Sequence, residues 1–286
     1  MKKREYHHYR PYMTRAKQLL AVSLIVIFCL LPLYYIFITS LKPDGSEYKL
    51  PLEVWPSQPT LQAYRTILGG GDINFLVPLR NSFIVSSSVT ILTLLLSGLA
   101  AYAIARLRFR HKIPSLLFLL MGAVIPLAST IVPTFMLLRT FGLLCTLPGL
   151  IIPNTIYNVP LCTWLLVCYF AEIPFEIDDA AKVDGYRPLQ IFWRVIMPLS
   201  GPGLFSAGIF AFLGSWGEFM LASVVIMGVP SAETVPVALL NFSQYYRLQW
   251  TWISAGIIVS VTFIVLLAAF FQRWVIRGLT AGSVKY

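Results

Sequence analysis

Charged side chains are scarce in this chain of 286 residues, because only 12% are Asp, Glu, Lys or Arg. Soluble domains have roughly 25%. Apolar side chains make up 57% and the mean hydropathy is +0.75, so the composition indicates an integral membrane protein. The formal net charge is +10. The basic residues separate hydrophobic runs instead of forming one patch, which is typical of membrane topology and argues against a nucleic-acid partner.

Histidine and cysteine are also scarce. None of the three histidines has a partner at metal-ligand spacing, and the four cysteines lie in or next to apolar runs, with no zinc or disulfide pattern. We therefore expect no metal site. The sequence has no G-x-x-x-x-G-K-[ST] loop, which ATPases of the P-loop class use to hold phosphates. No cluster of His, Cys and acidic residues offers a nucleophile with its base, so we do not expect an enzyme.

Six apolar runs are each long enough to cross a bilayer, which takes about 20 residues per helix. They predict an all-α membrane protein with spans at 18–40, 82–105, 113–136, 148–170, 204–228 and 251–273. Sixteen of the 22 Lys and Arg residues fall on one side of these spans. The positive-inside rule places that side, with both termini, in the cytoplasm. The predicted organisation is a tail (1–17), a six-span domain (18–273) with a cytoplasmic loop (171–203), and a second tail (274–286).

Two outer segments follow from this topology. Segment 41–81 contains prolines 43, 51, 56 and 59 and a run of three glycines, and we expect an irregular loop with a short helix near 60–68, which Thr60 caps. Segment 229–250 contains Glu233, which we expect to be exposed. Its aromatic residues either form an interfacial belt or face a docked partner.

The cytoplasmic loop is the chain's most unusual stretch, since five of the twelve acidic residues lie between Glu172 and Asp184. Charge is costly at membrane depth. We expect a helix from Pro174, a turn at 184–185 and a second helix from Pro188. Phe192 and Ile196 share one stripe of that helix, and prolines 198 and 202 are expected to end it. The loop is either an ordinary connection or an element that docks another protein; its length favours docking.

The stretch Asp179-Ala180-Ala181-x-x-Asp184-Gly185, followed by Phe192 and Pro198, resembles the "EAA" signature of binding-protein-dependent importer permeases of the ATP-binding-cassette class. The family usually has Glu where this chain has Asp179. Other stretches are similar to the smaller permease subunit of maltose-type systems, and they extend over nearly the whole chain: 39–43 (TSLKP), 81–83 (NSF), 100–106 (AAYAIAR), 215–219 (SWGEF) and 277–285 (RGLTAGSVK).

The resemblance implies a type I importer permease fold in a bacterial cytoplasmic membrane. It implies a second, different permease subunit, two ATPase copies that hold ATP and Mg²⁺, and an extracytoplasmic solute-binding protein, with no cofactor on this chain. A carbohydrate would enter the cytoplasm by alternating access. Residues implied to contact the ATPase are Glu176, Asp178, Asp179, Ala180, Ala181, Asp184, Gly185, Phe192 and Pro198, and in the tail Gly278, Thr280, Gly282 and Lys285.

Polar and aromatic residues inside the spans are candidates for the substrate pathway. Glu218 is the one acid well inside a predicted span. It either hydrogen-bonds a sugar hydroxyl or gates the cavity, or it holds neighbouring helices in place. Trp216 either stacks on a sugar ring or packs in the core. Asn154, Tyr157 and Asn158 either line the pathway or satisfy backbone groups near prolines. The alternatives left open are a permease for a non-sugar solute and an ion-coupled secondary transporter.

Overall fold

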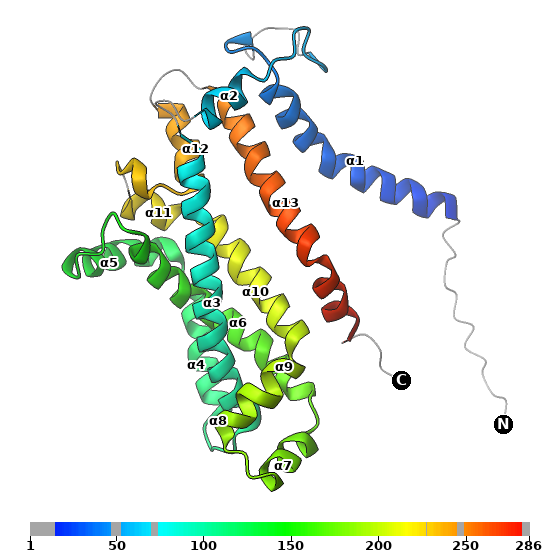
Figure 1. Cartoon of the computed structure of the whole chain (residues 1–286), viewed down its shortest axis with the longest axis vertical. Helices are drawn as coiled ribbons and strands as arrows, with labels where there is room; N and C mark the ends of the chain where they lie inside the picture. The colour runs from blue at the N-terminus through cyan, green and yellow to red at the C-terminus, as the bar shows by residue number, and fades with distance from the viewer. Residues whose placement is uncertain (1–14, 47–52, 70–73, 227, 245–248, 282–286) are drawn as a thin grey trace, which may run out of the picture.

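The computed structural model describes residues 15–46, 53–69, 74–226, 228–244 and 249–281, and all regular structure in these ranges is helical (Figure 1). The first half of the chain forms α1 (Arg15–Ser40), α2 (Gln62–Leu68), α3 (Leu76–Arg106), α4 (Lys112–Val124), α5 (Leu127–Thr140) and α6 (Leu147–Glu172). The second half forms α7 (Phe175–Val183), α8 (Pro188–Ile191), the π-helix η2 (Phe192–Ile196), α9 (Met197–Leu199), α10 (Gly201–Trp216), α11 (Met220–Val225), the 3₁₀-helix η3 (Pro230–Ala232), α12 (Val235–Gln244) and α13 (Trp250–Ala281).

Four straight stretches are long and apolar enough to cross a membrane: 17–40, 76–106, 147–172 and 250–269. Two pairs of helices are bent, α4 with α5 by 91° and the α8–α9 segment with α10 by 83°, and they raise the number to six if each pair is one span. This confirms the predicted all-helical membrane fold. The final helix also continues to Ala281, past the predicted end of the last span at 273.

The predicted third span, 113–136, is not one straight helix. Helix α4 ends at Val124, Ile125 and Pro126 are extended (ψ 120° and 134°), and α5 then runs to Thr140. The cause is local, because the Pro126 ring disfavours a helical conformation for the residue before it. The bend turns α5 away from the axis of α4 (Figure 1).

The predicted fifth span, 204–228, is also wrong as a continuous helix. Helix α10 begins at Gly201 and ends at Trp216, and a break over 217–219 precedes the short helix α11. The helical segment that starts at Pro188 ends at Leu199, between prolines 198 and 202, as expected. Pro202 lies in the first turn of α10, where the missing N–H costs no hydrogen bond. The chain bends at Ser200, before α10 begins.

The centre of the bundle is the pair α3 and α6, with α10 packed against both. At the α7 end, the core contains Tyr102, Phe170 and Phe192. Glycines allow close helix approach there, as is common between membrane helices. A Cβ at Gly98 of α3 would lie 3.4 Å from the Phe192 ring, and one at Gly203 of α10 would overlap the Tyr169 ring.

Helix α1 diverges from this bundle (Figure 1). Its best membrane-crossing window has no buried residue, and it packs against α13. Over residues 17–40, only the last turn is buried, at Ile38, Thr39 and Ser40. There the Ser40 hydroxyl lies 2.7 Å from the Tyr64 hydroxyl of α2.

The outer segments cover the end of the bundle opposite α7 (Figure 1). The predicted short helix is confirmed as α2, and the Thr60 hydroxyl accepts from the Gln62 N–H at 3.1 Å. The buried Asn81 at the start of α3 donates to the carbonyls of Ser231 and Glu233, both at 2.9 Å. This bonding fixes the segment after η3 against α3.

Candidate functional site

Helix α7 is the centre of the loop between α6 and α10. Pro174, the predicted first residue of the helix, occupies the N-cap instead with ψ 139°, so the helix begins one residue later, at Phe175. Glu176 and Asp178 lie in the first turn and Lys182 in the last, an arrangement that the helix dipole stabilises. The predicted turn is confirmed, because Gly185 has φ +81°, a conformation that disfavours any residue with a Cβ.

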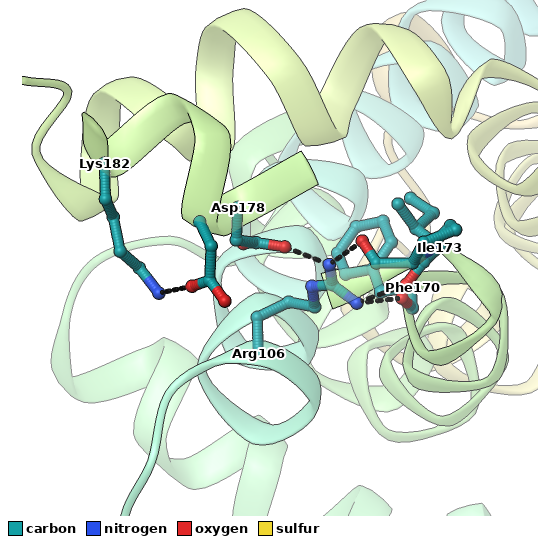
Figure 2. Close-up of polar contacts among 7 residues, drawn as sticks. Arg106, Phe170, Ile173, Asp178 and Lys182 are labelled. Carbon is teal, nitrogen blue, oxygen red and sulfur yellow. Dashed lines mark hydrogen bonds and ion pairs between the residues drawn. The ribbon is translucent and has the colours of Figure 1, made fainter. Parts of the chain in front are cut away.

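One buried arginine attaches α7 to the membrane helices. Arg106, the last residue of α3, forms an ion pair with Asp178 of α7 (Figure 2), and the two side chains are only 1% and 6% exposed. The same guanidinium lies 4.2 Å from the centre of the Phe175 ring. A charge pair at this burial is costly to break, because either partner alone would remain a desolvated charge.

Arg106 also binds the end of α6. Its guanidinium donates to the carbonyl oxygens of Phe170 at 3.2 Å, Ile173 at 2.6 Å and Pro174 at 2.9 Å (Figure 2). The last carbonyls of a helix have no partner within it, and a cation there interacts favourably with the negative end of the helix dipole. One side chain therefore joins the ends of α3 and α6 to the start of α7.

The neighbouring acid, Asp179, has a different role in the fold. Its carboxylate accepts from the Lys182 ammonium at 2.7 Å, and the two side chains are 67% and 60% exposed. The hydrogen bond and charge of Lys182 lower the pKa of Asp179, so this carboxylate is charged on the surface. Asp178, by contrast, faces inward to Arg106.

The exposed face of α7 combines acidic and apolar side chains. Besides Asp179, the residues Glu176, Ala180 and Asp184 are exposed. Val183 is 89% exposed and Leu189 of α8 is 60% exposed, and neither is a defined position of the motif. Apolar side chains are therefore exposed on the same loop as the acids.

The remaining loop residues divide between core and surface. Ala181 is 6% exposed and packs inward, and Phe192 is fully buried against Tyr102, with ring centroids 5.3 Å apart. Pro198 is exposed in α9. The structure thus brings Asp178, Ala181 and Phe192 together in the core under the loop, and leaves the other loop residues of the motif facing outward.

Two of the three candidate pathway residues of α6 form hydrogen bonds within their own helix. The Asn154 amide donates to the Leu150 carbonyl at 3.0 Å, and the Asn158 amide donates to the Asn154 carbonyl at 2.8 Å. These are not the carbonyls that the prolines of α6 leave without a donor. The Tyr157 hydroxyl differs, because it lies 2.7 Å from the Thr130 hydroxyl and 3.3 Å from that of Thr134, both on α5.

Trp216 and Glu218 are at the break after α10. Trp216 is 6% exposed and stacks between Phe212 and Phe263, with ring centroids 5.6 and 5.2 Å away. The Glu218 carboxylate accepts from the N–H groups of Leu221 at 2.7 Å and Ala222 at 3.0 Å. It therefore caps the start of α11, which is where unpaired N–H groups need an acceptor.

The candidate tail residues are only partly described. Gly278 and Thr280 lie in the last turns of α13, whereas Gly282 and Lys285 lie outside the described residues. Among the residues described, no group of three His, Cys, Asp or Glu side chains is arranged to hold a metal ion.

The arrangement of spans with a short helix pair between α6 and α10 is the fold of an importer permease. A crystal structure of a bacterial ABC transporter involved in the import of the acidic polysaccharide alginate has this fold, with a TM-score of 0.72 and 20% identity over 92% of this chain and 99% of that one. Residues 79–281 match the family of binding-protein-dependent transport system inner membrane components, and the chain belongs to this family. It is a multi-pass transport subunit.

Curated relatives are similar over nearly their full length. The sulfoquinovosyl glycerol transport system permease protein SmoH of Agrobacterium fabrum is 35% identical, over 93% of this chain and 92% of its own. The trehalose transport system permease protein SugB of Mycobacterium tuberculosis is 38% identical, over 92% and 95%. The trehalose/maltose transport system permease protein MalG of Thermococcus litoralis is 31% identical, over 93% and 95%.

Proposed function

We propose that this chain is one of two different permease subunits in an ATP-driven, binding-protein-dependent sugar importer of the cytoplasmic membrane. The cargo is a di- or oligosaccharide or a sugar-like solute. The family and the relatives named for sulfoquinovosyl glycerol, trehalose and maltose support this assignment. The observation that carries it is the attachment of α7, whose outer face is acidic and apolar while its inner face is bonded to α3 and α6 through Arg106.

The attachment of α7 to α3 and α6 provides a route by which a movement of the ATPase subunits is passed to the spans. ATP and Mg²⁺ bind to the partner ATPase subunits, and the closure of these subunits displaces the docked α7. Because Arg106 bonds α7, the end of α6 and α3 together, the displacement moves both spans as one body. The two membrane conformations then differ in their free energy of binding to open and closed ATPase, which is what a population shift requires. The chain itself contributes no catalytic group.

A second permease subunit is supported by the polar surface of α5 and α6. Within predicted spans the Tyr157 hydroxyl is hydrogen-bonded to those of Thr130 and Thr134, and all three residues are only partly buried. Partly exposed polar groups at membrane depth face protein or a water-filled path rather than lipid. We assign this face to the interface with the other permease and to the solute pathway.

The test is affinity purification of the tagged chain from its native membrane in mild detergent, followed by identification of the co-eluting proteins and reconstitution in liposomes. We expect a second permease and an ATPase to co-elute, and ATP-dependent uptake of a sugar delivered by the co-encoded binding protein. Elution alone or as a homomer, without an ATPase, would contradict the importer assignment. ATP-dependent uptake of only non-sugar solutes would contradict the sugar assignment alone.

A further inference from the structure

A cavity of about 680 Å³ opens at the outer end of the bundle, between the start of α3, η3, α12 and the start of α13. These elements lie at the end of the molecule opposite α7 (Figure 1), so the cavity is on the extracytoplasmic side. Its volume is within the range of small-molecule sites, about 300–1,000 Å³. The lining consists of Asn74, Phe75, Val77, Pro78, Arg80, Pro230, Ser231, Glu233, Ala238, Asn241, Phe242, Gln249 and Trp252.

Part of the lining is aromatic and held in place. The Phe242 ring contacts Phe75 (5.8 Å between centroids) and, edge-on, Trp252 (6.4 Å). The Trp252 indole N–H donates to the Asp44 carboxylate at 3.3 Å, and the neighbouring Thr251 hydroxyl donates to the same carboxylate at 2.6 Å. The indole is thus oriented before any ligand arrives, which lowers the entropy cost of binding.

Another part of the lining is polar. Glu233 is half-buried, in contrast to the exposed position expected from the sequence, and its carboxylate accepts from the Asn241 amide at 2.7 Å. The Asn81 bonds to the Ser231 and Glu233 carbonyls fix this edge of the cavity. Arg80 contributes further N–H donors.

The lining chemistry indicates the class of ligand. Arg80 and Glu233 carry opposite charges, so the lining side chains have no net charge and do not select a phosphate or another anion. Paired donors and acceptors on amide, carboxylate and guanidinium groups match vicinal hydroxyls. Aromatic side chains offer an apolar surface next to these polar groups, which fits the C–H face of a sugar ring.

We propose that this cavity is an outer saccharide subsite, which holds a neutral mono- or disaccharide as it leaves the binding protein and before it enters the membrane. The proposal deepens the sugar-importer function and depends on it. The subsite uses Trp252 and Phe242 as the stacking surface and Glu233, Asn241 and Arg80 as the hydroxyl-binding groups. It is distinct from the Thr130–Tyr157 face inside the spans.

The experiment is saturation-transfer difference NMR on the purified transporter complex in nanodiscs, without binding protein. Trehalose and maltose are the probes, and glycine betaine is the non-sugar control. Asn241→Ala and Arg80→Ala each remove ligand hydrogen bonds, and we expect about fivefold weaker sugar binding for each, the effect of roughly one hydrogen bond. Arg65→Ala is the matched control, because Arg65 is exposed on α2 on the same outer face but outside the cavity.

The outcomes separate the subsite from the importer function. Equal sugar signals in wild type, the cavity variants and Arg65→Ala would overturn the subsite, as would the absence of any sugar signal. Because Arg80 is exposed, its variant tests the idea even if Asn241→Ala fails to assemble. ATP-driven uptake measured on the same preparations tests the importer function. If uptake occurs and the cavity variants bind sugar as well as the wild type does, the subsite proposal alone is contradicted. If the cavity variants weaken sugar binding but no ATP-driven uptake occurs, the importer function is contradicted.

Discussion

Asp178→Asn should detach α7 from the spans. The substitution keeps the size of the side chain but leaves the Arg106 charge buried without its counter-ion, and breaking a buried pair costs about 3–5 kcal/mol. Arg106 retains its three bonds to the carbonyls of Phe170, Ile173 and Pro174, so we expect the lower end of this range. About 3 kcal/mol corresponds to roughly a 100-fold higher population of detached α7.

Amide hydrogen exchange of α7 in the purified complex measures this population directly. We expect roughly 100-fold faster exchange over 177–183 in Asp178→Asn, and more ATP hydrolysed per sugar imported in liposomes. Glu172→Gln is the control, since this exposed carboxylate at the end of α6 is neither a partner of Arg106 nor among the residues implied to contact the ATPase, and the substitution should leave the exchange unchanged. Wild-type exchange in Asp178→Asn would refute the idea that Arg106 holds α7 to the spans.

Three further substitutions test other parts of the structure. Gly185→Ala should weaken coupling between ATP hydrolysis and uptake, because φ +81° costs a residue with a Cβ about 1–2 kcal/mol; wild-type coupling would show that the turn is not needed. Glu218→Ala should lower the free energy of unfolding by about 1 kcal/mol, because it removes the acceptor that caps α11. Glu218→Gln keeps one acceptor and should lower it less; equal thermal-unfolding midpoints for wild type and Glu218→Ala would contradict the capping role. Gly203→Ala should reduce assembly, measured by size-exclusion chromatography, since its Cβ would overlap the Tyr169 ring; Gly201→Ala, with open space around it, should assemble normally, and equal yields would contradict the proposed close packing.

The sequence predicted those features that depend on local chemistry. Apolar runs located the membrane-crossing stretches, prolines located the start of α8 within the loop, and Gly185 located the turn. The bend between α4 and α5 was missed although its signal, Pro126, is in the sequence. Hydropathy alone does not register a bend, because the residues on both sides of it are equally apolar.

The distinction between the two adjacent acids was not predictable. Consecutive residues on a helix point about 100° apart, so Asp178 and Asp179 can face different surroundings, but local sequence does not say whether either of them is buried. The partner that decides it, Arg106, is 72 residues away in the chain. The role of Glu218 was similarly hidden, because it depends on where α10 ends. Gly282 and Lys285 in the tail remain predictions.

The exposure of α1 has a consequence for how the transporter is assembled. In water, a helix with an unburied apolar window of mean hydropathy 2.6 would aggregate, whereas lipid tails solvate it as well as another helix would. The chain can therefore be inserted into the bilayer before it meets its partner subunits, because lipid tails cover the exposed face of α1 in the meantime. Its final pairing is then chosen by shape and polar contacts, since hydrophobicity no longer distinguishes a neighbouring subunit from lipid.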